Sequence, residues 1–367
     1  MKTKLSKAEY LVIPVLVPRL PETPELIPYL QQIDNSRIYS NFGPLHRQFA
    51  SGLGALTNAS GVALTSNGTT AIELALRALD LPRDGSCFMP AYTFIASAHA
   101  VANAGLIPHF LDVDERSLAL TPEIVKRALD GASTKPAAVL VVSAYGAPMD
   151  VENWNRFSEA FDIPVVFDGA AAITSITDVG KNPICVSLHA TKTLGIGEGG
   201  AVLSSDAKIC DRITAMTGFG FTGTERVSQF LGGNYRISEY AAAIGLASLD
   251  MLPARVQRLK GVAVSYRSAL GDKRTRMQEN IGEVWISTTL NVRIPADAVE
   301  QTTRRLDSSA IAWRRWWGYG CHTHPAFASY SHEELSITNV IANEIIGLPF
   351  YEDITETEIQ QVVDCLV

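Results

Sequence analysis

Short apolar runs alternate with amphipathic stretches between about residues 61 and 206. This alternation is typical of βα units around a mainly parallel sheet. The stretch Thr70–Leu79 carries apolar residues at helical spacing, and Thr121-Pro122-Glu123 is typical of a helix start. The apolar runs predict strands at Val62–Thr65, Leu106–Asp114, Ala137–Tyr145, Pro164–Asp168, Ile184–Leu188 and Ala201–Ser205.

The pattern changes after Met216, where a glycine-rich loop precedes two long helical stretches, Ile237–Met251 and about 253–270. The remaining residues predict a smaller α+β unit, in which Thr355 and Glu358 have the spacing of a capping box. We expect an α/β protein with an N-terminal segment (1–40), a large domain (41–251) and a small C-terminal domain (252–367). The elements predicted in the small domain are a strand or hairpin at Val284–Pro295 and helices at Asp297–Ser308 and Thr355–Val363.

The composition narrows the class of protein. Of the 367 residues, 47% are hydrophobic and 19% charged, so the chain can bury a large core and is not typical of a disordered protein. The net charge is −7 and no run of basic residues could neutralise a phosphate backbone, so we expect no nucleic-acid partner. Because no apolar stretch approaches the ~20 residues of a membrane span, we also expect no membrane association.

The cysteines and the N-terminal residues bear on the compartment. The apolar run Tyr10–Val17 contains Pro14 and lacks a small-residue cleavage site, which argues against a signal peptide. The cysteines are odd in number, widely spaced and without a CxxC pair, which argues against a disulfide framework or a zinc knuckle. We therefore expect a cytoplasmic protein. The five cysteines are Cys87, Cys185, Cys210, Cys321 and Cys365.

Two segments match the dinucleotide-binding pattern GxGxxG, namely Gly195–Gly200 and Gly218–Gly223. That pattern requires a preceding strand and a following helix, so that the pyrophosphate meets a helix N-terminus. The first match runs into the predicted strand Ala201–Ser205, and the second follows a predicted helix. The context therefore argues against a nicotinamide or flavin site.

Three other features of the sequence together indicate a different cofactor. The segment Ser66–Thr70 lies between a strand and a helix, where it could bind a phosphate or form an ordinary N-cap turn. Asp168 ends a predicted strand, where open α/β sheets bind ligands, and Lys192 follows in a loop rich in Ser, Thr and Gly. A pyridoxal 5'-phosphate (PLP) enzyme needs these parts: a lysine for the Schiff base, a carboxylate for the pyridinium nitrogen and donors for the phosphate.

Six ordered motifs between about residues 41 and 251 resemble those of the DegT/DnrJ/StrS-type sugar aminotransferases, with a weaker similarity at 313–325. The resemblance implies the fold of PLP enzymes of type I, the aspartate aminotransferase-like fold, with a mainly parallel seven-stranded sheet and a smaller C-terminal domain. The motifs begin at Asn67 (Asn-Gly-Thr-Thr-Ala), Pro90 (Pro-Ala-Tyr-Thr-Phe-Ile-Ala), Phe110 (Phe-Leu-Asp-Val-Asp), Ser187 (Ser-Leu-His-Ala-Thr-Lys), Gly197 (Gly-Glu-Gly-Gly-Ala-Val) and Gly233 (Gly-Asn-Tyr-Arg-Ile-Ser-Glu).

The resemblance also implies roles for single residues. Lys192 matches the Schiff-base lysine and Asp168 the partner of the pyridinium nitrogen. Phe94 matches an aromatic residue that stacks on the cofactor ring, although plain core packing is the alternative. Asn234 matches a residue that reaches the cofactor phosphate of the neighbouring subunit in a homodimer, the alternative being a loop cap. The phosphate-binding residues of the family correspond to Gly68, Thr69 and Ser187.

One position departs from the family pattern. The family usually has Gln or His three residues after the aspartate, near the ring hydroxyl of the cofactor, whereas this chain has Ala171. An alanine side chain cannot donate a hydrogen bond, so another group or water must satisfy that oxygen. Some relatives replace the lysine by histidine and act as dehydratases, and the presence of Lys192 therefore favours transamination.

The substrate contacts come from a second region of the chain. The family has aromatic and histidine residues near the sugar in the segment that matches Trp316–Pro325, which implies contacts from Trp317 and His322. Arg236 is one of several arginines that could bind the anionic part of the substrate. His322 and His324 could alternatively ligate a metal or have a local structural role, but no third ligand is apparent and we expect no metal.

The resemblance implies an aminotransferase that moves an amino group from an amino acid, by analogy glutamate, to the keto group of a nucleotide-linked sugar. Within enzymes, the alternatives are an aminotransferase for a cyclitol or another ketone, or a lyase or desulfurase on the same scaffold. A non-catalytic sensor that binds PLP without turnover is the alternative from another class. The retained Lys192 and Asp168 argue against the sensor.

Overall fold

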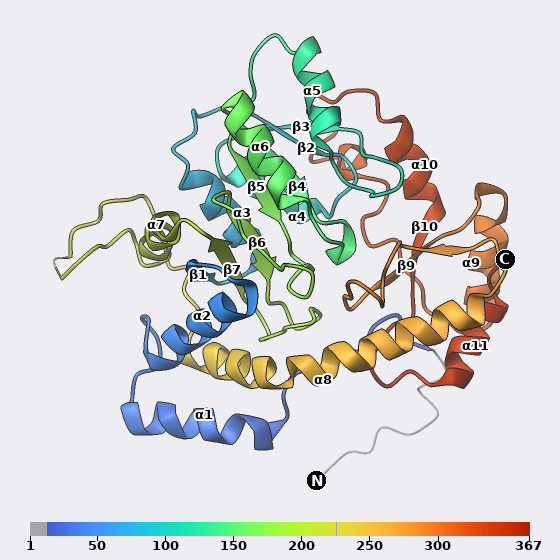
Figure 1. Ribbon diagram of the computed structural model, residues 1–367, viewed down its shortest axis with the longest axis horizontal. Helices are drawn as coiled ribbons and strands as arrows, with labels where there is room; N and C mark the ends of the chain where they lie inside the picture. The colour runs from blue at the N-terminus through green and yellow to red at the C-terminus, as the bar shows by residue number, and fades with distance from the viewer. Residues whose placement is uncertain (1–12, 225) are drawn as a thin grey trace.

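The computed structural model describes residues 13–224 and 226–367. Its centre is a seven-stranded sheet in the order β1-β7-β6-β5-β4-β2-β3 (Figure 1). Only β7 runs antiparallel to its neighbours β1 and β6, so the predicted mainly parallel sheet is confirmed. The strands are β1 (Gly61–Thr65), β2 (Ser86–Pro90), β3 (Ile107–Leu111), β4 (Ala138–Val142), β5 (Val165–Asp168), β6 (Ile184–Ser187) and β7 (Gly200–Ser204).

All six predicted strands are present at the predicted places, but two of them are shorter than predicted. The predicted runs Leu106–Asp114 and Ala137–Tyr145 shorten to β3 and β4, because the chain turns at the carboxyl ends of these strands. After β4 it forms a 3₁₀ turn, η2 (Ala144–Gly146). Strand β2 was not predicted, because its apolar run is limited to Cys87–Met89, between Ser86 and Pro90.

Helices cover both faces of the sheet, because alternate strand residues point to opposite sides. In β5, Val165 and Phe167 pack into the core on the side of α2, α5, α6 and α8, whereas Val166 packs into the core on the side of α3, α4 and α7. The sheet, with the carboxyl ends of its parallel strands, therefore lies between two layers of helices. The covering helices are α2 (Pro44–Thr57), α3 (Gly68–Arg77), α4 (Ile95–Asn103), α5 (Pro122–Gly131), α6 (Val151–Phe161), α7 (Ala207–Thr217) and α8 (Glu239–Leu270).

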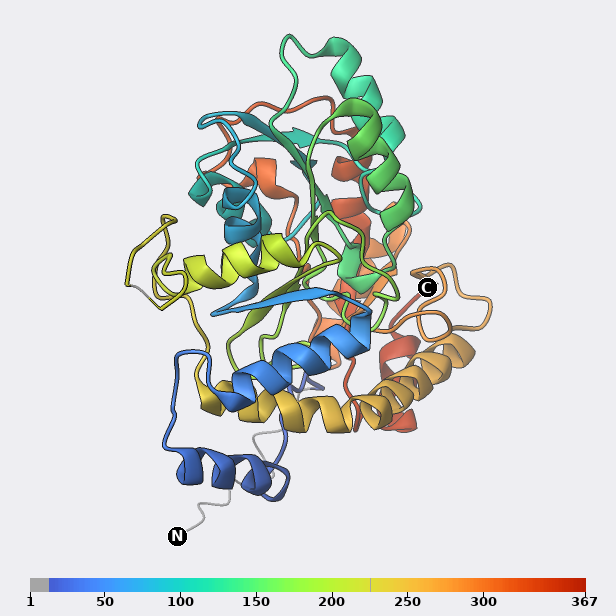
Figure 2. The same cartoon turned by 60° about the vertical axis from the view of Figure 1, so that its left-hand side comes forward.

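The two predicted helical stretches 237–251 and 253–270 form one continuous helix, α8, of 32 residues. A proline inside a helix removes one hydrogen bond and commonly kinks or ends the helix. Pro253 does not do so, because α8 packs against α1 (Thr23–Ser36) and α2 near one end and against α11 (Glu356–Asp364) near the other (Figure 2). The predicted domain boundary at residues 251/252 lies inside this helix, and the division into domains stays a prediction.

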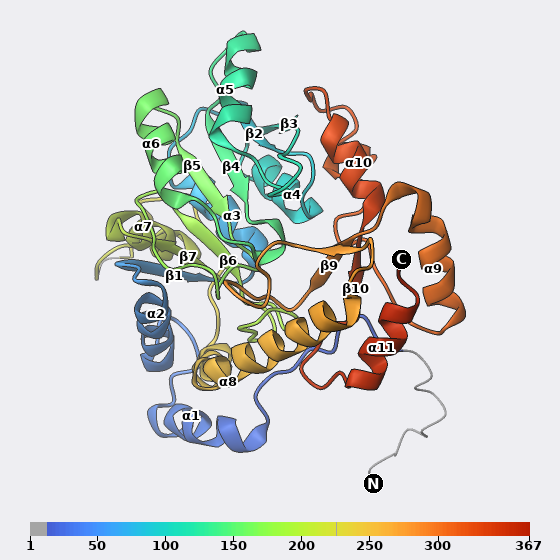
Figure 3. The same ribbon diagram turned by 45° about the vertical axis from the view of Figure 1, so that its right-hand side comes forward.

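The C-terminal residues build a second sheet of three antiparallel strands with its own core (Figure 3). The predicted strand Val284–Pro295 shortens to β9, and the predicted capping box of Thr355 and Glu358 is confirmed at the start of α11. The smaller α+β unit is thus present. Its other elements are β8 (Arg276–Met277), β9 (Leu290–Arg293), β10 (Ile345–Leu348), η3 (Ala296–Ala298), α9 (Val299–Ser308), η4 (Cys321–Thr323) and α10 (Ser336–Glu344).

The N-terminal segment lies against both units. Ile13 pairs with Ile311 near the small sheet, and the Tyr29 hydroxyl of α1 donates to Asp250 Oδ2 of α8 at 2.5 Å. Residues 1–12, which include part of the apolar run Tyr10–Val17, lie outside the described residues. Across residues 13–224 and 226–367, no helix is long and apolar enough to cross a membrane.

Candidate active site

A cradle for an anion forms where β6 ends beside the N-terminus of α3. Asn67 caps this helix, its Oδ1 accepting from the N–H of Thr70 at 2.8 Å. The N–H groups of Gly68 and Thr69 come earlier in the first turn, where a helix offers no internal partner. A Cβ added to Gly68 would lie 2.8 Å from Cβ of Ser187, so glycine is required for this close approach. Two backbone donors and the Ser187 hydroxyl therefore meet, as phosphate binding requires.

Gly200, the last glycine of the first GxGxxG match, also has a structural role. It begins β7 and is paired with Ser187 on one side and Thr65 on the other. A Cβ added there would lie 2.4 Å from the carbonyl oxygen of Asn67. Because this match runs into a strand and the match at 218–223 follows α7, neither has the strand-then-helix context of a dinucleotide site.

Asp168 is the last residue of β5 and is only 6% exposed. Its Oδ2 accepts from the Ser97 hydroxyl at 2.6 Å, and its Oδ1 accepts from the N–H of Ala170 at 3.1 Å. The hydroxyls of Thr93 and Ser97 lie 3.0 Å apart. Sequence reasoning missed Ser97, because no local pattern marks a residue that contacts a carboxylate 71 positions away.

Asp168 and Lys192 lie close enough to affect each other's ionisation. Burial raises the pKa of Asp168, while the Ser97 and Ala170 hydrogen bonds and the Lys192 charge oppose the rise. Burial lowers the pKa of Lys192 and the Asp168 charge opposes that fall. The site thus holds a carboxylate that gains from a cationic partner and an amine that loses its proton more readily than an exposed lysine.

Phe94 lies in the loop between β2 and α4, as the residue that precedes this helix. Its neighbours Tyr92 and Thr93 are buried, but Phe94 itself is 53% exposed. Core packing therefore does not account for this ring. Three residues later in the chain, the helix it precedes brings Ser97 to Asp168.

Three aromatic side chains form a wall beside this loop. The hydroxyls of Tyr92 and Tyr145 lie 2.8 Å apart, and the Trp317 ring stacks on that of Tyr145 with centroids 3.9 Å apart. Tyr145 adopts a left-handed φ of 57° within η2, a conformation that few side chains tolerate. The Cys321 N–H donates to the carbonyl of Ala91 at 2.7 Å, which joins the segment of Trp317 to the loop of Tyr92.

The departure at Ala171 lies close to this wall. A Cβ added to Gly146, which follows Tyr145 and has φ of +103°, would lie 2.5 Å from the Ala171 carbonyl oxygen. Glycine is therefore required beside Ala171. The alanine leaves this position without a side-chain donor for a ring hydroxyl.

His322 lies in η4, and its Nδ1 is buried without a hydrogen-bond partner among the described residues. Its ring lies 5.8 Å from that of His332, and burial, followed by the charge of His332, lowers the pKa of His322. No group of three or more His, Cys, Asp or Glu side chains within residues 13–224 and 226–367 could hold a metal ion.

Asn234 and Arg236 lie in the segment between α7 and α8. Their contacts are with other residues than those described above. Asn234 is exposed and pairs with Gly218. The Arg236 guanidinium lies 5.4 Å from the Phe219 ring centroid and donates to the Thr217 carbonyl at 3.4 Å. Within the described chain, neither residue forms a hydrogen bond with Asp168, Lys192 or the anion cradle.

The donor set fits PLP. The cradle at α3 would hold the phosphate, Asp168 would face the ring nitrogen, and Lys192 would supply the amine for the aldehyde. The exposed Phe94 ring is available to stack on the cofactor. The requirement for glycine at position 68 carries this fit most directly, since it keeps the cradle open to an oxyanion.

Comparisons with known proteins agree with this fit. The sugar-nucleotide enzyme dTDP-4-amino-4,6-dideoxy-D-glucose transaminase of Escherichia coli is 26% identical to this chain, covering 97% of it and 98% of the enzyme. The structure of DesI, determined with its TDP-sugar product, is 28% identical with a TM-score of 0.86, covering 95% of this chain and 91% of DesI.

A Bacillus cereus protein assigned as a PLP-dependent aminotransferase is 28% identical with a TM-score of 0.90, covering 96% of this chain and 99% of that protein. The model of the DegT/DnrJ/EryC1/StrS aminotransferase family matches residues 22–367. The expected fold type, cofactor and reaction class are therefore confirmed. This chain belongs to the DegT/DnrJ/EryC1/StrS aminotransferase family, whose members use PLP.

Proposed function

We propose that this enzyme transfers an amino group from an amino acid, with glutamate as the expected donor, to the keto group of a nucleotide-linked sugar. The observation that carries the proposal is the meeting of Lys192, Asp168 and the anion cradle at the carboxyl ends of β5 and β6. The E. coli relative and DesI, both named for dTDP- or TDP-linked sugars, support the substrate class.

The chain's own residues divide the chemistry between them. When bound, PLP supplies an electron sink for a carbanion at the amino acid Cα. The Lys192 Nζ moves the proton at that Cα, and its lowered pKa makes the neutral amine more available for this task. Asp168 would hold the ring nitrogen of the cofactor, while Gly68, Thr69 and Ser187 would hold its phosphate through backbone and hydroxyl donors.

The aromatic wall offers a surface for the sugar. Trp317 stacks on Tyr145, and its indole provides an apolar face for a deoxysugar ring. Arg315 is close enough for its charge to oppose the rise that burial causes in the pKa of Tyr92. Its Nη1 is buried and has no hydrogen-bond partner among the described residues, so it can bind an anionic group of a substrate. His322 follows on the same segment as a further contact.

We also propose that two copies of the chain form the active unit. A patch of exposed aromatic and aliphatic side chains surrounds the Asn234 loop, and a second copy would bury it. Tyr39 and Tyr240 stack there with ring centroids 6.3 Å apart. In such a dimer Asn234 and Arg236 would reach the partner's site. The patch comprises Tyr39, Phe219, Phe221, Val227, Leu231 and Tyr240.

The proposed compartment is the cytoplasm, which the state of the cysteines supports. All five are free and buried. Burial raises the pKa of the Cys87 and Cys210 thiols to about 12 in each case, which keeps them protonated and unreactive.

The substrate proposal is tested by running the two half-reactions separately. Glutamate should convert the bound PLP to pyridoxamine phosphate with loss of its visible absorbance, and a keto sugar nucleotide should restore that absorbance. Lys192→Ala should abolish both changes, whereas the exposed Lys181→Ala should leave them intact. If a cyclitol ketone restores the absorbance and keto sugar nucleotides do not, the substrate is a cyclitol and not a sugar. If no amino acid changes the absorbance, the protein is better explained as a non-catalytic sensor.

The dimer is tested by mixing two inactive variants. Lys192→Ala and Asn234→Ala chains should each be inactive or nearly so when alone. If Asn234 acts in the partner's site, mixed dimers contain one site with both native residues, and activity should return after exchange of subunits. No recovery, with mixed dimers shown to have formed, would contradict the shared site.

A further inference from the structure

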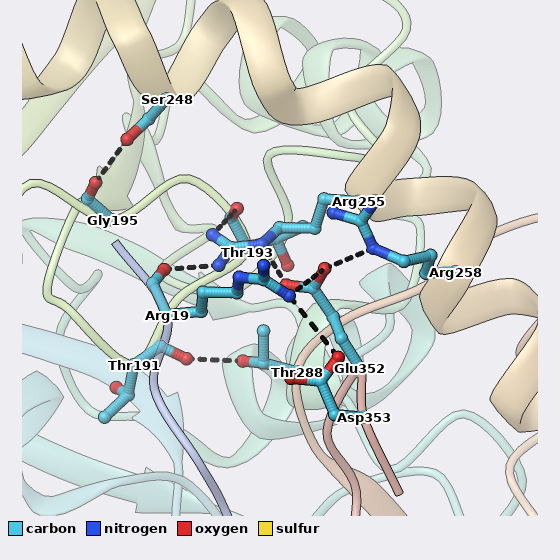
Figure 4. Close-up of polar contacts among 10 residues, drawn as sticks. All are labelled: Arg19, Thr191, Thr193, Gly195, Ser248, Arg255, Arg258, Thr288, Glu352 and Asp353. Carbon is cyan, nitrogen blue, oxygen red and sulfur yellow. Dashed lines mark hydrogen bonds and ion pairs between the residues drawn. The ribbon is translucent and has the colours of Figure 1, made fainter. Parts of the chain in front are cut away.

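The loop that carries Lys192 is fixed from outside by three side chains (Figure 4). The carbonyl oxygens on either side of the lysine each accept a hydrogen bond from a residue far away in the chain. The Thr288 hydroxyl donates to Thr191 at 2.6 Å, and the Arg255 Nη1 donates to Thr193 at 3.0 Å. The Ser248 hydroxyl donates to the next alternate carbonyl, that of Gly195, at 2.8 Å.

Arg255 is the charged member of this set and is only 7% exposed. Its Nε donates to Glu352 Oε1 at 2.7 Å, and its Nη2 donates to the Arg19 carbonyl. The other oxygen of Glu352 accepts from the Arg258 Nε at 2.6 Å. The Glu352 carboxylate, with a side chain 6% exposed, therefore holds Arg255 in the orientation that reaches the lysine loop.

A buried ion pair is an inefficient way to stabilise a fold, because well-packed apolar residues often stabilise as much or more. This pair does something that apolar residues cannot do. It places one donor of a rigid guanidinium against Thr193, directly after Lys192, while another donor of the same group is fixed to Glu352. The pair therefore sets the path of the backbone at the lysine.

We propose that Arg255, oriented by Glu352, is a positioning residue that holds the Lys192 amine toward Asp168. The proposal rests on the proposed function of Lys192. Thr288 and Ser248 act in the same way on the neighbouring carbonyls. Because the contacts come from α8, from the residues before β9 and from the segment before α11, the lysine is aimed only when these parts of the chain are packed together.

The chain supplies a matched control. Arg258 lies on the same helix and binds the same carboxylate, but among the described residues it forms no hydrogen bond with the lysine loop. Arg255→Met and Arg258→Met each remove one arginine from Glu352, and only the first removes the donor to Thr193. Arg255→Lys keeps the charge without the fork. Thr288→Val and Ser248→Ala, which remove one hydroxyl each, provide variants that leave the ion pair intact.

The first readout uses the protein without cofactor. The rate of reductive methylation of Lys192, followed by peptide mass spectrometry across pH, reports the pKa and accessibility of this amine. We expect the pH of half-maximal labelling to rise in Arg255→Met and to stay at the wild-type value in Arg258→Met, because a released lysine returns toward its solvated pKa. In Thr288→Val the pH of half-maximal labelling should also rise, but by less than in Arg255→Met.

The second readout is the half-reaction with an amino acid. We expect kcat to fall about 10- to 100-fold in Arg255→Met, with KM within about twofold, because misplacing a reacting group costs rate rather than binding. Arg255→Lys should recover part of the loss. Equal labelling profiles and equal kcat values for Arg255→Met and Arg258→Met would overturn the positioning role.

The outcomes separate this proposal from the one on which it rests. If wild-type Lys192 forms no borohydride-stable adduct with PLP, the assignment of the lysine fails. If it forms the adduct but the Arg255 and Arg258 variants behave alike, only the positioning proposal fails. If Arg255→Met does not fold, unchanged labelling and kcat in both Thr288→Val and Ser248→Ala would overturn it instead.

Discussion

Ser97→Ala removes the hydroxyl that binds the carboxylate of Asp168, and we predict that it shifts the acid limb of catalysis. Ser97 is fully buried and donates to Oδ2 at 2.6 Å, so among the described residues the Ala170 N–H is the one hydrogen-bond donor left on this carboxylate after substitution. The alanine adds no atoms, and it is a good helix former at this position in the first turn of α4. The main effect should therefore be electrostatic.

The size of the effect follows from the lost hydrogen bond. A hydrogen bond to a charged group contributes about 1.5–3 kcal/mol, and each pKa unit corresponds to about 1.4 kcal/mol. Because Ser97 stabilises the ionised form, its loss should raise the pKa of Asp168 further. At a given pH less of the carboxylate would then be charged, and the ring nitrogen would have a weaker partner.

The assay is the pH dependence of kcat/KM for the half-reaction with the amino acid donor, together with the PLP dissociation constant. We expect the acid limb to move to higher pH by about 1–2 units and the affinity for PLP to fall. Thr93→Val is the matched control, since Thr93 contacts the Ser97 hydroxyl at 3.0 Å but not the carboxylate. An unmoved acid limb in Ser97→Ala, or an equal shift in Thr93→Val, would refute the reasoning.

Three further predictions concern the cradle, the buried carboxylate and the aromatic wall. Gly68→Ala places a Cβ 2.8 Å from that of Ser187 and should raise the PLP dissociation constant at least about tenfold by spectral titration, so unchanged affinity would contradict the cradle. In the cofactor-free protein, the raised pKa of Asp168 makes its charge costly at neutral pH, so Asp168→Asn should increase the free energy of unfolding there. That gain should disappear as the pH falls toward about 4, and urea unfolding that shows a gain growing in acid would refute it. Trp317→Ala should raise KM for the keto sugar about tenfold and leave the donor half-reaction within about twofold, whereas equal effects on both would exclude a sugar contact.

Much of the sheet and the centre of the site could be predicted from local pattern. Buried strands are nearly continuous apolar runs, and β5 and β6 were predicted within a residue of their observed ends. Parallel strands end at one edge of a sheet, so Asp168 and Ser187 could be expected near each other. The residue types then suggested the cofactor.

The parts that escaped prediction depend on partners distant in sequence. Ser97 lies 71 residues from Asp168, and Arg255 lies 97 residues from Glu352, so no local spacing connects them. The continuity of α8 through Pro253 reflects packing of the whole helix, which overrides a local helix-breaking residue. Tyr145 was expected to extend a strand, whereas it turns with φ of 57° toward Trp317.

The central claim is that Lys192 is the residue that bonds to the cofactor. The direct measurement is borohydride reduction of the PLP-loaded wild-type enzyme, followed by protease digestion and mass spectrometry of the labelled peptide. We predict one stoichiometric pyridoxyl adduct, on Lys192. An adduct on a different lysine, or a protein that stays unlabelled at saturating PLP, would contradict the account.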